Sequence, residues 1–385
     1  MQRGLIGLGI GLMTLLCLGL TAFAQEGGTI KVAQGDLTVG GYIHLWGTSV
    51  QDDETQTDTP DVFAARRARL ILSGHVVPKV AYRLQEELVL GNATSRDALI
   101  KFEDITLGEK FIINITAGQY KYPLSEAGLK WGTPADELVR GPWIYEGGNG
   151  AAGTISDRDT GLLIDGAAND KKLKWFLGIF NGKGTNNPET NDQKDLMLRV
   201  TAALFEKGSS LEGLGFGLGY MKGAQGKEDE ASGQTGMELR TRLAGTVQYE
   251  KELGGGTLQT RFEYLSQKQE QNSANDRLNW DDAETTNWYF QVAYKLKHGF
   301  LSGENQALQP VIRYQNYEYD DGDLDPNDTD WEGTMLTVGA NLILNKQTRL
   351  MINYNSIDDD TWVAAKAKRL DLDNNEILLQ LELKF

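Results

Sequence analysis

The chain has almost no cysteine, and its single one, Cys17, lies in the apolar N-terminal stretch. Disulfide bonds, zinc–thiolate sites and a cysteine nucleophile are therefore excluded from residues 25–385. Histidine is also rare: His44, His75 and His298 are the only three, and none lies in a GxSxG or HExxH context. We therefore expect no cofactor and no metal, and we predict that the protein is not an enzyme.

The chain also lacks a second long apolar run. After residues 4–20 no stretch would make a membrane-spanning helix, and the mean hydropathy is −0.40. Strands of a membrane barrel alternate apolar and polar residues, so this absence does not exclude such a barrel. Residues 1–24 combine Arg3, an apolar core and a small-residue box at residues 22–24, which predicts a secretory signal peptide. The alternative interpretation is an N-terminal membrane anchor.

Instead, the chain contains many runs in which apolar and polar residues alternate with a period of two. Most of these runs have about ten residues, enough to cross a bilayer at a tilt, and none has a clear helical period. The sixteen strands that we predict are 37–47, 63–75, 79–90, 97–107, 111–120, 158–167, 172–182, 194–205, 213–222, 237–250, 257–267, 284–298, 308–319, 333–344, 348–357 and 376–385. We expect residues 25–385 to form one all-β domain, a 16-stranded antiparallel transmembrane β-barrel.

The C-terminal run supports this fold class. Glu376–Phe385 alternates along its length and ends on an aromatic residue. It is similar to the terminal strand of bacterial outer-membrane barrels, whereas the alternative is an ordinary edge strand. We therefore expect a multi-pass protein of the Gram-negative outer membrane.

The connections alternate between short and long, as expected for periplasmic turns and extracellular loops. The longest connection, Lys121–Asp157, is the third extracellular loop and is rich in Gly, Pro and Trp. Structureless connections of this length are usually functional. Sixteen strands enclose a lumen wide enough to admit it, so we predict that 121–157 folds into the lumen as a constriction.

Charge is distributed unevenly. The net charge is −16, but the eight predicted outer loops carry −20, and the strands and turns carry +3 once Arg3 is removed. Alternation places many cations inward, and rings of Arg or Lys select for anions. The alternative is that they pair with lumen acids such as Glu87 and Glu263. Glu86 does not fit this pattern, because alternation places its charged side chain on the outer face of the barrel. The candidate pore-lining, anion-guiding residues are Arg67, Arg69, Arg83, Lys101, Lys121, Lys130, Arg140, Arg199, Arg240, Arg242 and Arg261.

The acidic run Asp320–Asp328 has the composition of a calcium loop but not its spacing. A solvated loop is the simpler interpretation, and bridging to lipopolysaccharide through divalent cations is the alternative. We expect contacts with outer-membrane lipid and no binding of nucleic acid.

Phe63–Asp104 resembles the phosphate-selective porin O and P family through its F-x-x-R-R-A-R-L run and the two strands after it. Similar pieces follow at Ile115–Pro123, Arg158–Gly166 and Trp175–Gly182. The resemblance implies a trimeric porin, narrowed by its third loop, through which small anionic solutes such as phosphate diffuse passively. The alternatives are a general or carbohydrate-type porin, and a plugged scaffold barrel that holds a partner.

Overall fold

The computed structural model describes residues 29–32, 35–51, 62–89, 93–108, 111–146, 155–168, 172–189, 191–225, 228–229, 234–235, 238–272, 280–297, 306–320, 331–363, 368–373 and 375–385. The predicted signal peptide, residues 1–24, and most of the acidic run 320–328 lie outside these ranges. Within them, no helix has the length and apolar character needed to cross a membrane.

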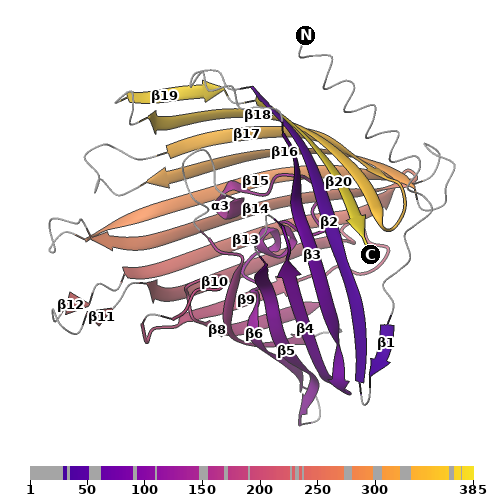
Figure 1. Ribbon diagram of the computed structural model, residues 1–385, viewed down its shortest axis with the longest axis vertical. Coiled ribbons are helices and arrows are strands. Elements are labelled where there is room, and N and C mark those ends of the chain that lie inside the picture. The colour runs from indigo at the N-terminus through magenta and orange to yellow at the C-terminus, as the bar shows by residue number, and fades with distance from the viewer. Residues whose placement is uncertain are drawn as a thin grey trace.

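One antiparallel sheet of 18 strands dominates the molecule and closes on itself (Figure 1). Sixteen of its strands form the wall, and they match the sixteen predicted runs one for one, which confirms the predicted barrel. The wall strands are β2 (Gly35–Gln51), β3 (Val62–Val77), β4 (Val80–Glu87), β5 (Thr94–Leu107), β6 (Phe111–Lys121), β7 (Arg158–Ala168), β8 (Leu173–Phe180), β9 (Asp195–Ala202), β10 (Leu214–Gln225), β13 (Glu238–Leu253), β14 (Gly256–Asn272), β15 (Trp280–Lys297), β16 (Ala307–Asp320), β17 (Trp331–Ile343), β18 (Thr348–Val363) and β20 (Asn375–Lys384).

The barrel closes where its first and last wall strands pair. The register of β2 and β20 runs from Tyr42 opposite Lys384 to Gln51 opposite Asn375. Gly41 and Phe385 then exchange backbone hydrogen bonds of 2.9 and 3.1 Å. Beyond this point β1 (Thr29–Val32) pairs with the start of β2, from Gly35 to Thr38.

Four strands were not predicted. β1 is one, and β11 (Glu228–Asp229) and β12 (Gln234–Thr235) form a small hairpin inside a predicted loop. The predicted loop 358–375 is largely strand, because β18 continues to Val363 and pairs there with β19 (Lys368–Asp373). β1 (Thr-Ile-Lys-Val) is too short to show a period, and the stretches at β11, β12 and 358–373 are rich in polar and charged residues, so the apolar alternation of the wall strands is weak or absent there.

Alternation along each strand gives the wall two different faces. Along β16, buried Val311, Arg313 and Gln315 alternate with exposed Ile312 and Tyr314. We call the exposed, largely nonpolar side the apolar face; it includes Leu84, Ile100, Leu218, Phe290 and Ile352. We call the opposite side the polar face; it includes Arg69, Glu87, Arg242, Glu263 and Gln315. Nonpolar side chains exposed over so large a surface are typical of a wall that faces lipid.

Glu86 lies on the apolar face, opposite Leu70 of β3, and is half-buried. The pairing of β4 with β5 shifts at this residue, because Gln85 is opposite Asp97 whereas Glu86 is opposite Ser95. An extra residue on one strand is a β-bulge, which re-aims the side chains beside it. The discordant register of Glu86 therefore coincides with a local irregularity of the sheet.

Candidate functional site

Residues 122–157, which we call the bridging segment, connect β6 to β7 and contain α2 (Glu126–Lys130) and α3 (Trp143–Glu146). The segment forms hydrogen bonds with polar-face side chains from ten wall strands besides the flanking β6 and β7. These side chains are Tyr42, Arg69, Arg199, Arg242, Glu263, Gln291, Arg313, Asn341, Asn353 and Glu376. Such contacts fix the segment across the width of the barrel.

The first helix of the segment is held at its start. The Ser125 side chain caps α2 by accepting a hydrogen bond from the Gly128 N–H at 2.9 Å. Glu263, a fully buried residue of β14, accepts the N–H groups of Glu126 and Ala127 at 2.7 and 2.9 Å. A carboxylate at a helix N-terminus satisfies donors that have no partner within the helix.

Glu263 is also fixed from the wall side. Thr246 Oγ1 and the Tyr289 hydroxyl donate to its carboxylate at 2.9 and 2.8 Å. Four donors from three parts of the chain therefore converge on one buried side chain. A buried charge is tolerated when its hydrogen-bonding capacity is filled in this way.

A ring of nonpolar side chains, which we call the nonpolar ring, interrupts the polar face. Its members come from nine consecutive wall strands, β7 to β17: Leu163, Phe180, Met197, Met221, Ala244, Leu265, Tyr289, Tyr317 and Met335. Leu124, Trp143, Ile144, Tyr145 and Ile155 of the bridging segment pack against this ring. The segment therefore shares a hydrophobic core with the wall, and burial of these side chains stabilises its position.

Glycines allow the closest approaches between segment and wall. At Gly219 of β10, a Cβ atom would lie 2.2 Å from the Leu124 carbonyl oxygen. At Gly132, which has a φ of 65°, a Cβ atom would lie 2.6 Å from the Arg67 guanidinium. Both positions require glycine, the second for its backbone conformation as well.

The acidic pair Asp136–Glu137 belongs to a part of the segment that faces β14 to β18. Burial and the neighbouring carboxylate of Glu137 raise the pKa of Asp136. Burial also acts to raise the pKa of Glu137, but Arg261 and Lys130 outweigh it and lower that pKa. Gln291 donates to Glu137 at 3.1 Å as well. Glu137 is thus stabilised as an anion, and the two adjacent carboxyls differ in acidity.

A second cluster of charges joins the two ends of the segment. Asp157 lies 3.0 Å from the Lys121 ammonium and 2.6 Å from the Arg158 guanidinium. Burial acts to raise the pKa of Asp157, but these two cations lower it to about 2. Arg158 also pairs with Asp97 of β5 at 2.8 Å. These ion pairs hold the start and the end of the segment together.

The eleven predicted cations fall into two groups, and each lies within 4 Å of a carboxylate. Seven have side chains that are at most 11% exposed: Arg67 and Arg69 beside Glu87, Lys121 beside Asp157, Arg199 beside Glu126, Arg240 and Arg242 beside Asp195, and Arg261 beside Glu137. Four are 24–37% exposed: Arg83 beside Asp97, Lys101 beside Glu103, Lys130 beside Glu137, and Arg140 beside Glu376. Only the second group offers solvent a substantial charged surface.

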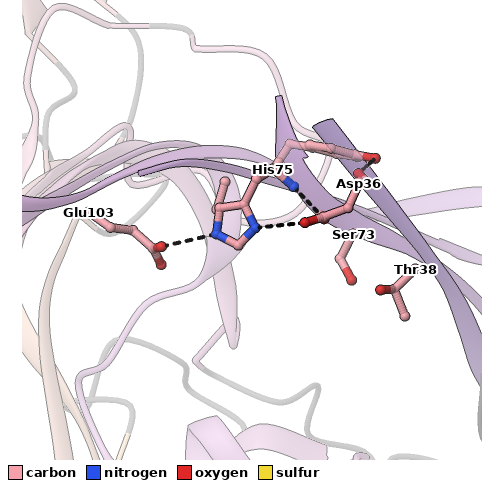
Figure 2. Close-up of a pocket in the computed structure, with 8 residues that line it drawn as sticks. Asp36, Thr38, Ser73, His75 and Glu103 are labelled. Carbon is pink, nitrogen blue, oxygen red and sulfur yellow. Dashed lines mark hydrogen bonds and ion pairs between the residues drawn. The ribbon is translucent and has the colours of Figure 1, made fainter. Parts of the chain in front are cut away.

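Part of the polar face is half-exposed, toward the ends of β2, β3, β4 and β5. We call it the exposed strip; it comprises Asp36, Thr38, Ser73, His75, Arg83, Lys101 and Glu103. All except Arg83 and Lys101 line a pocket of about 440 Å³ (Figure 2). By contrast, polar-face residues in the middle of the strands are buried, both on these strands (Arg69, Gln85) and across the barrel (Glu263, Gln315). The bridging segment therefore covers the middle of the polar face and leaves positions near the strand ends exposed, which also include Lys174, Gln248 and Glu250.

Arg158, the nonpolar ring and the role of Glu263 as the partner of α2 were not foreseen from the sequence. The ring could have been noticed, because Leu163, Met197, Met221 and Met335 fall at positions that alternation reserves for polar residues. In the described ranges no group of three His, Cys, Asp or Glu side chains is arranged to hold a metal ion.

The geometry defines a class of fold, the sixteen-stranded antiparallel barrel of multi-pass outer-membrane porins. No protein-family model and no curated protein matches the chain. Among solved structures, it is similar to the outer membrane channel DcaP of Acinetobacter baumannii, with a TM-score of 0.63 and 13% identity over 94% of this chain and 100% of that one.

Two further structures are similar at the level of fold. The anion-selective porin from Comamonas acidovorans has a TM-score of 0.60 and 14% identity, over 91% of this chain and 100% of that one. OmpT of Vibrio cholerae has a TM-score of 0.57 and 13% identity, over 93% of this chain and 100% of that one.

Proposed function

We propose that the protein is an outer-membrane porin, a water-filled channel for passive diffusion of small hydrophilic solutes. In this proposal the apolar face meets lipid, the polar face lines the lumen, and the bridging segment narrows the lumen. The observation that carries it is the unequal cover of the polar face. The segment packs against the middle of the wall, in large part through the nonpolar ring on β7 to β17, whereas the strip toward the ends of β2, β3, β4 and β5 remains half-exposed.

We propose further that solutes pass along the exposed strip. Arg83, Lys101 and Glu103 have side chains that are 31–37% exposed, which water and ions can reach. A channel needs a continuous polar surface on at least one side, and its lining charges set its selectivity. This proposal assigns different roles to the two groups of cations: the seven buried ones hold the segment or, like Arg240, join parts of the wall, and the four exposed ones meet the solute.

An anion preference is the selectivity that we propose. Arg83, Lys101, Lys130 and Arg140 are the exposed cations, and Arg guanidinium groups suit carboxylate and phosphate. Phosphate is one such solute, and the similar barrel from Comamonas acidovorans is described as anion-selective. The preference is expected to be modest, because a carboxylate lies beside each of these four cations.

We also propose that residues 1–24 direct export and are removed, and that three copies associate in the outer membrane. A solved form of OmpT of Vibrio cholerae is described as a trimer. The acidic outer loops would face lipopolysaccharide.

A plugged scaffold barrel is the second candidate. The extensive nonpolar packing between the bridging segment and nine wall strands favours it, because such a core resembles a protein interior. Steady current distinguishes the two functions. The purified protein in a planar bilayer is expected to give stable current steps, whereas a plugged barrel gives none.

A segment deletion tests the constriction separately. Replacing Thr133–Tyr145 by a short Gly-Ser linker should raise the single-channel conductance. The same linker placed in the outer hairpin at residues 230–233 is the control and should leave conductance unchanged. Equal conductance in both variants would show that the segment does not narrow the channel.

A further inference from the structure

His75 lies near the end of β3, between carboxylates from two other strands (Figure 2). Its Nδ1 atom is 3.5 Å from Asp36 Oδ2, and its Nε2 atom is 3.3 Å from Glu103 Oε2. The His75 backbone N–H also donates to Asp36 Oδ1 at 2.8 Å, which fixes that carboxylate. The imidazole thus has an acceptor on each side.

The protonated ring has one donor for each of these two acceptors. A neutral imidazole carries one N–H, so it can donate to only one of the two carboxylates, whereas an imidazolium can donate to both. Histidine is the side chain that ordinarily changes charge between pH 5 and 8. A proton gained at His75 therefore adds one positive charge to a cluster arranged to receive it.

The groups around the ring determine the net charge of the cluster. Asp36 comes from β2, and Glu103 from β5, where Lys101 lies 3.4 Å from it. On β4 the residue opposite His75 is Ala81, and the nearby Tyr82 donates its hydroxyl to the Asp36 carbonyl. With a neutral imidazole these groups sum to one negative charge, and with an imidazolium they sum to zero.

The cluster is accessible, as a group acting on passing ions must be. The side chains of His75, Asp36 and Glu103 are 42%, 39% and 31% exposed and line the pocket of about 440 Å³. His44 is also on the polar face, but it is buried beside Glu382. Of the two histidines in the described ranges, His75 is therefore the one that solvent reaches.

From this placement we propose that His75 is a selectivity-determining residue of the channel. Its protonation removes the net negative charge of the cluster formed by Asp36, His75, Lys101 and Glu103, and so favours anions over cations. The inference rests on the proposed channel function and adds to it a dependence of selectivity on pH.

Reversal potentials in a KCl gradient test this inference. For the wild type, the anion-over-cation permeability ratio should rise about twofold from pH 8 to pH 5, the effect of one unit charge near the path after screening by salt. In His75→Asn most of this rise should be lost. If His75→Asn keeps the full wild-type rise, His75 is not the group responsible.

Two further variants test the charge directly. Glu103→Gln keeps the imidazole and should raise the ratio at both pH values. His75→Cys in a Cys17→Ser background, labelled at pH 8 with a cationic thiol reagent, should shift the ratio toward anions, and an anionic reagent should shift it the opposite way. Complete labelling without either shift would overturn the inference. An absence of current in the wild type would instead refute the channel function itself.

Discussion

Glu263 Oε2 accepts the backbone N–H of Ala127 at 2.9 Å, across a separation of 136 residues. This bond joins the middle of a wall strand to the first turn of α2. Glu263 is fully buried and also accepts hydrogen bonds from Glu126, Thr246 and Tyr289. It therefore links the bridging segment to β13, β14 and β15. We consider it the principal polar anchor of the segment, beside the nonpolar ring.

Removing this anchor should loosen the segment without unfolding the barrel. Glu263→Ala leaves four donors without their acceptor, a loss of about 3 kcal/mol or more in the free energy that holds the segment. We expect larger and noisier single-channel currents. Glu318→Ala removes an exposed glutamate from β16 and is the matched control, for which wild-type currents are expected. Quiet, unchanged currents in Glu263→Ala would show that the nonpolar ring alone is enough to hold the segment in place.

Cysteine accessibility should locate the route of solutes. In a Cys17→Ser background, a bulky thiol reagent should reduce the current through Ser73→Cys, because Ser73 lines the pocket on the exposed strip. The same reagent should not affect Thr337→Cys, because Thr337 is buried on β17 and bonded to Asn355 at 2.7 Å. Block at Thr337→Cys but not at Ser73→Cys would place the route on the opposite side.

Charges on the exposed strip and charges on the apolar face should differ in their effect on selectivity. Lys101→Glu replaces a 34% exposed cation of the strip by an anion and should lower the anion-over-cation permeability ratio severalfold. Lys268→Glu changes an exposed charge on β14 beside Glu284, on the apolar side of the register, and serves as the control. Reversal potentials in a salt gradient give both ratios. Equal ratios for the two variants would contradict a route along the strip.

The Asp157 cluster predicts a definite dependence of stability on pH. The pKa of Asp157 is lowered from 3.8 to about 2, so its ion pairs contribute about 2 kcal/mol that is present above pH 4. This contribution is lost as the pH falls from about 4 toward 2, because the unfolded chain takes up the proton first. Denaturant midpoints of the wild type and Asp157→Asn should therefore differ by a constant amount from pH 7 to pH 4 and converge below. A constant difference down to pH 2 would exclude this linkage.

Much of the barrel could be predicted from the sequence, because burial on one face imposes a period of two on each strand. Sixteen strands followed from that pattern. The extension of β18 to Val363 and its partner β19 did not, because the run of three aspartates at 358–360 breaks the alternation of polar and apolar residues. Lys101 and Arg240 carry the same inward register, so alternation assigned them the same role. Their different exposures depend on where the bridging segment lies, and that path is fixed by contacts between residues far apart in sequence.

The nonpolar ring escaped prediction for a related physical reason. A Met or Tyr at an inward position of a single strand is ordinary, and only the closed sheet brings nine such positions to one level. Likewise, Glu263 looked like any lumen acid until its partners on α2 were placed. Local patterns therefore indicate which face a side chain occupies, whereas its partners are a property of the whole barrel.

The polar face has two kinds of position: those packed in the middle of the barrel, and those nearer the strand ends that stay half-exposed. At packed positions, which include Arg69 and Gln85 as well as the nonpolar ring, a substitution disturbs a packed interior and its effect is measured mainly in folding. At half-exposed positions such as Ser73 and Lys101, a side chain can change at smaller cost to the fold. In the proposed channel, selection for a new solute can therefore act on the exposed positions while the packed ones preserve the scaffold.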